Sequence, residues 1–291
     1  MSLKRIVSAN SLMWLVIAAV SLLCLLPLLL ILVISFTDEA EIVRHGYSFF
    51  PGKLSLEAYS LLFKSGKQMF NSYGITIFVT VVGTTAATLI TGMASFAISN
   101  PSVRNRDKLA MYFFIPMVFS GGMVPWYMIN RAIGLTDNIL ALIIPTLLFS
   151  PFNLFLVRNY MRELPISLIE SAKLDGANDV TIAFKIFFPL SMPILATVAL
   201  FYSIGYWNDW WNAIMLVSDI NLYPVQYFLM KLKSEASMLK NMQSMAGGGA
   251  FKPQESLQMA TAIITIGPII LLYPFLQRFF VKGLVVGSVK G

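Results

Sequence analysis

Six long apolar runs constrain the fold of this chain more than any other feature. Each has 19 to 28 residues, and a helix of roughly 20 residues, rising about 1.5 Å per residue, crosses the ~30 Å hydrocarbon core of a bilayer. The residues are 57% hydrophobic and 12% charged, whereas soluble domains have roughly 45–50% and about 25%. The sequence predicts an all-α membrane protein with six transmembrane helices at Leu12–Phe36, Asn71–Ile98, Leu109–Ile129, Ile139–Val157, Met192–Val217 and Leu257–Val281.

The loops between the runs indicate which side of the membrane each part occupies. Six spans put both chain ends on one side, and that side holds 12 of the 21 Lys and Arg residues. Basic loops stay preferentially in the cytoplasm, so this side is expected to be cytoplasmic. The expected layout is a cytoplasmic N-terminus at 1–11, a transmembrane domain at 12–281 with extracytoplasmic loops at 37–70 and 218–256 and a cytoplasmic loop at 158–190, and a cytoplasmic tail at 282–291.

The third run contains more helix breakers than a straight helix tolerates. Pro116, Gly121, Gly122 and Pro125 lie within 10 residues. Proline removes a backbone donor and glycine loosens the helix, so the run is expected to bend. Irregular backbone at membrane depth is tolerated where protein or a water-filled cavity satisfies it. We therefore expect this run to line a path through the membrane.

Composition excludes several kinds of chemistry. One cysteine, Cys24, and one histidine, His45, leave too few ligands for a His/Cys metal site and no internal disulfide. The net charge of +7 is spread along the loops between apolar runs, unlike the clustered basic face of a nucleic-acid-binding protein. No GxxxxGK[ST] loop is present to bind nucleotide phosphates. We predict no catalytic residues, no metal and no cofactor in this chain.

The loop 158–190 is predicted to form two short helices. Apolar residues recur at helical spacing over Ile166–Leu174, and a second helix is expected at Val180–Phe188, capped by Asn178 or Asp179 and stopped by Pro189. Gly176 suits the tight turn between them. The loop's four basic and four acidic residues favour a protein-docking element, whereas helices lying on lipid headgroups are usually rich in Lys and Arg. The surface-helix alternative remains open on the residues alone.

This loop resembles the EAA loop of ATP-binding-cassette import permeases. The family pattern is EAA, three residues, G, nine residues, I, one residue, LP, and its spacing is reproduced throughout. Ser171 replaces the second Ala and Phe188 replaces Leu. Asp175 and Ala177 are similar to the carbohydrate-uptake branch of the type I importers. The matching or flanking positions are Glu170, Ser171, Ala172, Asp175, Gly176, Ala177, Ile186 and Pro189.

The resemblance implies a complex assembled from several chains. Its components would be a second, related permease, two ATPase subunits that bind ATP and Mg, an extracytoplasmic solute-binding protein and an oligosaccharide substrate, in a bacterial inner membrane. The EAA loop would fit a cleft of an ATPase. The last ten residues are similar to the tail of a maltose-type permease, which implies that Gly287, Val289, Lys290 and Gly291 contact the ATPase subunits.

A polar and aromatic segment in the fifth run is the candidate substrate path. Asp209 is the carboxylate within a predicted span, and such residues usually face the bundle interior or an aqueous cavity. At helical spacing Trp207 and Trp211 would share one face and Asn208 and Asn212 the next, an arrangement that suits a sugar. Interfacial tryptophans and a partner for Asp209 on another subunit are the alternatives. The candidates are Tyr206, Trp207, Asn208, Asp209, Trp211, Asn212 and, in the fourth run, Asn153.

Three other protein classes were weighed against an import permease. An ion-coupled secondary transporter would also have broken helices, but it would more often carry ion-coupling groups and internal repeats. An intramembrane aspartyl protease needs a second catalytic carboxylate within a span. A channel has no use for a docking loop. The secondary transporter of a small solute is the leading alternative.

Overall fold

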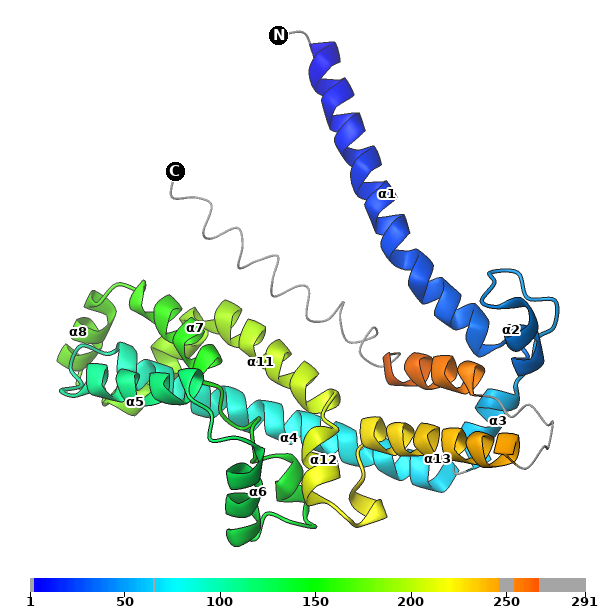
Figure 1. Cartoon of the computed structure of the whole chain (residues 1–291). Helices are drawn as coiled ribbons and strands as arrows, with labels where there is room; N and C mark the ends of the chain where they lie inside the picture. The colour runs from blue at the N-terminus through cyan, green and yellow to red at the C-terminus, as the bar shows by residue number, and fades with distance from the viewer. Residues whose placement is uncertain (1–2, 65, 246–253, 267–291) are drawn as a thin grey trace. The chain divides into compact units, whose positions relative to one another are not determined.

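The computed structural model describes residues 3–64, 66–245 and 254–266. These residues are mostly helical, and the strand pairing among them is one isolated antiparallel bridge between Thr37 and Leu54. The described residues divide into two compact units, one formed by residues up to 69 together with those from 229 onward, and the other by residues 70–228. Figure 1 shows the helices of both. The expected all-α class is confirmed.

The first unit contains the long helix α1 (Leu3–Ser35), which is continuous through the predicted first span. Its section Met13–Ser35 is long and apolar enough to cross a membrane, and most of its side chains are exposed within this chain. The helix has a uniformly apolar surface because no polar residue other than Ser21 interrupts residues 13–34. An exposed helix of this composition is stable when lipid or another apolar surface surrounds it.

Two short helices follow α1 in the first unit, α2 (Glu39–His45) and α3 (Glu57–Lys64). Asp38 begins α2 by accepting a hydrogen bond from the Ala40 amide at 3.0 Å. Lys53 lies 2.8 Å from the same carboxylate, and its hydrogen bond lowers the pKa of Asp38. Gly46 ends α2 in the left-handed region, with φ of 76°.

Glu39 joins α2 to the helix at 255–266, which is distant in sequence. The carboxylate is 6% exposed and accepts hydrogen bonds from the Glu255 amide, the Ser256 amide and the Ser256 hydroxyl at 2.9–3.1 Å. The first amides of a helix have no partner within it, so an outside carboxylate satisfies them and interacts favourably with the helix dipole. Tyr47 adds a hydrogen bond to the Glu255 carboxylate at 2.8 Å.

The second unit is built around α4 (Gly66–Ser99), 34 residues long and apolar enough to span a membrane. Its small residues let α11 (Met192–Trp207) approach closely. A Cβ at Gly83 would lie 2.4 Å from the Tyr206 ring, and one at Gly92 would lie 2.6 Å from Phe188. Small residues on this helix therefore allow neighbouring side chains to pack closely against its backbone.

The third predicted span bends sharply, as the breakers indicated. α5 (Arg106–Val118) and α6 (Met123–Ala132) are separated by four residues and differ in direction by 118°. Gly122 occupies the left-handed region at the break, with φ of 85°.

The fourth and fifth predicted spans are not continuous helices. The fourth consists of a 3-10 turn, η1 (Ile139–Leu142), an irregular stretch and then α7 (Pro151–Arg162). The fifth breaks after α11 and resumes as α12 (Trp211–Leu216). η3 (Ile220–Leu222) and α13 (Val225–Met245) follow.

The number of spans differs between the sequence and the described helices. Two described helices meet the length and composition of a span, and the count rises to four if each bent pair is one span. The sixth predicted span begins in the helix at 255–266, and its remainder lies outside the described residues. Six spans therefore remain a prediction.

The Glu39 contacts predict a measurable stability effect. Replacing Glu39 with Ala leaves two helix-end amides and the Ser256 hydroxyl without their acceptor, which should lower the free energy of unfolding by about 1–3 kcal/mol. Thermal unfolding of the purified protein measures this loss. Glu235→Ala, at an exposed carboxylate of α13, is the control, and equal midpoints for the two variants would contradict the assigned role.

Candidate functional site

The first helix of the loop 158–190 is α8 (Ser167–Leu174), within one residue of the expected helix. It ends in a Schellman motif: the Ala177 amide donates to the Ala172 carbonyl at 2.9 Å and the Gly176 amide donates to the Lys173 carbonyl at 3.0 Å. Gly176 has φ of 80°, a conformation that side chains disfavour. Open space surrounds its Cβ position. The tight turn therefore requires glycine because of its backbone angle and not because of a steric contact.

The EAA-type residues divide into a buried set and an exposed set. Ala172 is buried and Ala177 and Ile186 are half-buried, so they hold the two helices on the body of the unit. Leu174 is 89% exposed although it is large and apolar. The exposed set contains Glu170, Ser171, Asp175, Gly176 and Pro189.

The second helix of the loop begins as expected and ends later than expected. α9 (Asp179–Ile182) starts at Asn178, whose side chain accepts from the Thr181 amide at 2.8 Å. A π-helical turn, η2 (Ala183–Phe187), and α10 (Phe188–Leu190) continue it. The expectation that Pro189 stops the helix was wrong, because Pro189 lies in the first turn of α10, where a missing backbone donor costs little. The helix turns by 84° only before α11.

Two contacts fasten the helix pair to the end of α4. Lys173 donates a hydrogen bond to the Ser102 hydroxyl at 3.0 Å and lies 3.5 Å from the Asp179 carboxylate. Phe187 is 2% exposed and packs edge-on against Phe96, with ring centroids 5.0 Å apart. The turn at Gly176 therefore stands on a rigid base. The sequence carries no distinctive signal for Lys173 or Leu174, because Lys and Leu are common in amphipathic helices.

The segment after α11 does not keep the two faces expected for a continuous helix. Trp207 is 4% exposed, while Trp211 is 37% exposed and packs edge-on against Trp210 at 5.8 Å. Asn208 is exposed and donates to the Ile204 carbonyl, whereas Asn212 is 1% exposed and donates to the Pro145 carbonyl at 3.1 Å. The pairing of Trp207 with Trp211 and of Asn208 with Asn212 was wrong, because the helix breaks between them.

Asp209 sits at that break. Its Oδ1 accepts hydrogen bonds from the Trp211 amide at 3.1 Å and the Asn212 amide at 3.2 Å. Its Oδ2 is buried and has no hydrogen-bond partner among the described residues. One carboxylate oxygen thus accepts hydrogen bonds from the first amides of α12, and the other is available to a group outside the described residues.

The remaining substrate-path candidates are mostly buried inside this chain. Tyr206 is 1% exposed and donates to the Ile143 carbonyl at 2.8 Å, and Asn153 is 6% exposed near the start of α7. The candidates with exposed side chains are Asn208 and Trp211, and Asp209 is half-buried. The tail candidates Gly287, Val289, Lys290 and Gly291 lie outside the described residues.

The fold and the loop together define a class of protein. Long apolar helices, broken spans and a rigid exposed helix pair on a chain without a phosphate-binding loop are features of the membrane subunit of a transporter with several components. The chain belongs to the family of binding-protein-dependent transport system inner membrane components, whose model matches residues 3–286. The expected family is confirmed, and the chain is a transport subunit and not an enzyme.

Known relatives agree with this assignment along nearly the whole chain. The polygalacturonan/rhamnogalacturonan transport system permease protein YtcP of Bacillus subtilis is 36% identical, over 93% of this chain and 94% of the relative. Protein LplC of the same organism is 36% identical, over 94% and 91%. A chain in the crystal structure of a bacterial ABC transporter involved in the import of the acidic polysaccharide alginate has a similar fold, with a TM-score of 0.76 to this chain. The two chains are 30% identical, and the match covers 96% of this chain and 99% of that chain.

The geometry at Asp209 predicts different effects for two substitutions. Asp209→Ala removes the acceptor of two amides and should lower stability by about 1 kcal/mol, as loss of a helix cap does. Asp209→Asn keeps an acceptor oxygen and should retain most of that stability. Thermal unfolding of both variants measures the difference. Equal stability of the Ala variant and the unmodified protein would show that the carboxylate does not begin α12.

Proposed function

We propose that this chain forms, with a second permease, the translocation path of an oligosaccharide importer and couples it to ATP hydrolysis through the loop 158–190. The observation that carries the proposal is the exposed turn after α8, with Glu170, Leu174 and Asp175 at its surface and a buried base beneath it. Two ATPase subunits would bind ATP and Mg, since this chain has no loop that binds nucleotide phosphates.

Coupling through the loop 158–190 requires that the loop be stiff. A partner that moves by a few ångströms transmits its motion only if the element that it holds does not bend. α8 is closed by two Schellman hydrogen bonds and fastened by Lys173 to Ser102, and the helix from α9 to α10 is joined to α11 through Ser191 with an 84° change of direction. Movement of the turn would therefore be transmitted to α11, and from it to the break at Asp209.

The family name supports an extracytoplasmic binding protein as the component that delivers substrate. We place both termini and the loop 158–190 in the cytoplasm of a bacterial cell, on the distribution of Lys and Arg. The tail residues Gly287, Val289, Lys290 and Gly291 would contact the ATPase subunits. The exposed surface of α1 supports contact with lipid or with the second permease.

The substrate class follows from the relatives. The names of two of them refer to polygalacturonan and rhamnogalacturonan and to the acidic polysaccharide alginate. We infer an oligosaccharide substrate, and uronate-containing oligosaccharides are the first to test. In this chain Asn208, Asp209 and Trp211 are the accessible candidates for contact with it, while Tyr206, Trp207, Asn212 and Asn153 would support the path from within.

The proposal predicts that Gly176→Asp abolishes transport while the protein still inserts into the membrane. The substituted residue is strained at a φ of 80° and adds a side chain to the turn that the ATPase would hold. The measurement is the ATPase rate of the purified complex in lipid, with its binding protein and with or without uronate oligosaccharides. We expect the sugar to stimulate the rate in the unmodified complex and not in the variant.

Gly134→Asp is the matched control, because Gly134 also has a positive φ, 77°, and open space around its Cβ position. It lies outside the loop 158–190 and should retain stimulation. Normal stimulated ATPase and uptake in the Gly176→Asp variant would refute coupling through this turn. Stimulation by no sugar in a competent complex would refute the substrate class only.

A further inference from the structure

A basic cavity lies beneath the helix pair of the loop 158–190. Its volume is about 230 Å³, equal to roughly eight water molecules at ~30 Å³ each. The ends of α4 and α7, the start of α5, α8 and η2 all contribute to its wall. Arg106 and Arg162 provide the charge, and Met161, Leu164, Ile169 and Phe187 provide apolar surface.

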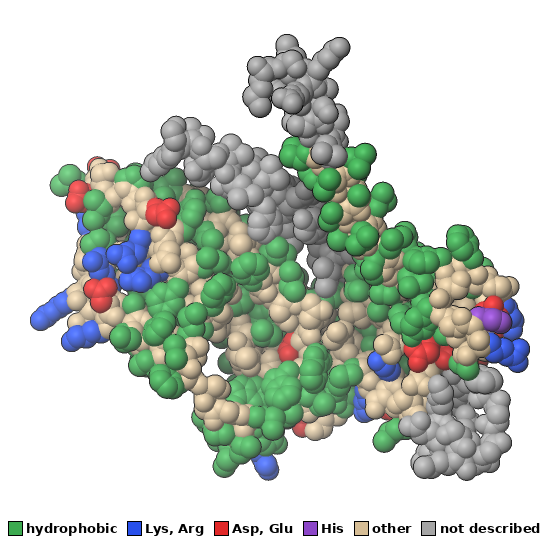
Figure 2. Space-filling view, turned by 45° about the horizontal axis from the view of Figure 1, so that its top comes forward, with side chains coloured by type: hydrophobic (Ala, Val, Ile, Leu, Met, Phe, Trp, Pro, Cys, Tyr) green, Lys and Arg blue, Asp and Glu red, His purple; other side chains and the backbone are tan. Residues whose placement is uncertain are grey.

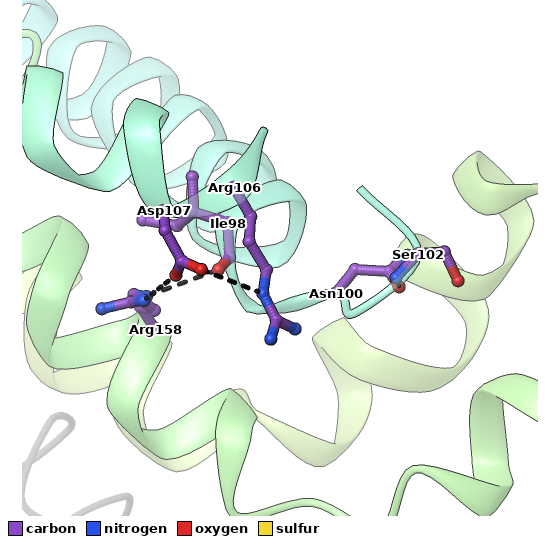
Figure 3. Close-up of polar contacts among 6 residues, drawn as sticks. All are labelled: Ile98, Asn100, Ser102, Arg106, Asp107 and Arg158. Atoms are coloured by element: carbon purple, nitrogen blue, oxygen red, sulfur yellow. Dashed lines mark hydrogen bonds and ion pairs between the residues drawn. The ribbon is translucent and has the colours of Figure 1, made fainter. Parts of the chain in front are cut away.

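The arginines around this cavity outnumber the acidic residues that pair with them. Asp107 is shared, with one oxygen 3.9 Å from the Arg106 Nε and the other 3.7 Å from an Nη of Arg158 (Figure 3). The Arg158 Nε also donates to the Ile98 carbonyl at 3.4 Å. Asp107 itself is 80% exposed, so water weakens both of its ion pairs.

Arg162 has no ion pair or hydrogen bond from its side chain within the described ranges, although Glu163 is its neighbour in sequence. Burial lowers the pKa of Arg158, and the positive charge of Arg162 lowers it further. The three guanidinium groups are thus close enough to repel one another. Figure 2 shows basic side chains gathered at the end of the second unit where α5 and α8 lie.

We propose that this cavity binds the phosphate of an anionic phospholipid headgroup between Arg106 and Arg162. A guanidinium presents several N–H donors in a planar fork that fits phosphate oxygens, and the donors of Arg162 are available. The apolar wall suits the glycerol and the first carbons of the acyl chains. The cavity lies at the ends of α4 and α5, the level at which lipid headgroups meet membrane helices, and basic pockets there bind anionic lipids.

A bound lipid would affect the docking turn directly. Ile169 lines the cavity from α8, one residue before Glu170, and Phe187 lines it from η2. An anion between the arginines would relieve their repulsion and hold α5, α7 and α8 together. This inference does not depend on the proposed coupling, because it concerns lipid bound by this chain whatever its partners.

The test measures lipid binding to the full-length protein, purified with its copurifying partners and stripped of lipid in detergent. Native mass spectrometry counts bound lipids, and thermal unfolding is followed while phosphatidylglycerol, phosphatidylcholine or inorganic phosphate is added. We expect phosphatidylglycerol to raise the unfolding temperature more than the other two. Arg106→Gln with Arg162→Gln should remove one bound phosphatidylglycerol and raise the lipid concentration needed for stabilisation about tenfold or more.

Two further variants make the outcome decisive. Arg44→Gln with Arg131→Gln removes two exposed charges elsewhere and should leave the effect intact. Arg162→Gln alone disturbs no described contact, so it tests the site even if the double variant fails to fold. Equal stabilisation by phosphatidylcholine, or an unchanged response in the Arg162→Gln variant, would overturn the site. Full stabilisation by inorganic phosphate would overturn the lipid as its source.

Discussion

The structure of the second unit depends on one requirement, that backbone polar groups inside a membrane protein find partners within it. The stretch between η1 and α7 has irregular backbone, and three side chains from α11 and α12 satisfy it. Tyr206 donates to the Ile143 carbonyl, Asn212 donates to the Pro145 carbonyl, and the Tyr202 hydroxyl accepts from the Ser150 amide at 3.0 Å. Side chains on either side of the break in the fifth predicted span therefore satisfy the irregular backbone of the fourth.

These contacts give the polar residues of the fifth predicted span a structural role. Their aromatic and amide character suits a sugar, but the same character suits a broken backbone, and the structure uses Tyr206 and Asn212 for the second purpose. Asp209 combines a structural role with room for a ligand. Its Oδ1 accepts hydrogen bonds from the first amides of α12, and its Oδ2 has no partner among the described residues. A carboxylate at a helix break inside a transport subunit can respond to a ligand without losing its structural contact.

The sequence predicted those features that depend on local chemistry. The bend at Gly122, the cap at Asn178 and the turn at Gly176 follow from the conformations that these residues favour. The sequence did not predict the interruption of the fourth and fifth spans, because hydropathy measures whether a segment prefers lipid and not whether its helix is continuous. Pro189 was misjudged for a related reason: a proline ends a helix or begins the next turn depending on the hydrogen bonds around it.

The cavity below α8 could not be predicted either, because it joins arginines that are 56 residues apart in the sequence. Arg106 belongs to a short basic loop and Arg162 to the end of another helix, and only the contact between α5 and α7 brings them to one wall. Their charge lies behind the docking turn and not on it, whereas Leu174 and Asp175 are exposed at the turn itself. The loop 158–190 thus has an exposed turn at one end and a separate positive charge at its base. A ligand that neutralises this charge would stiffen the base without competing for the exposed turn.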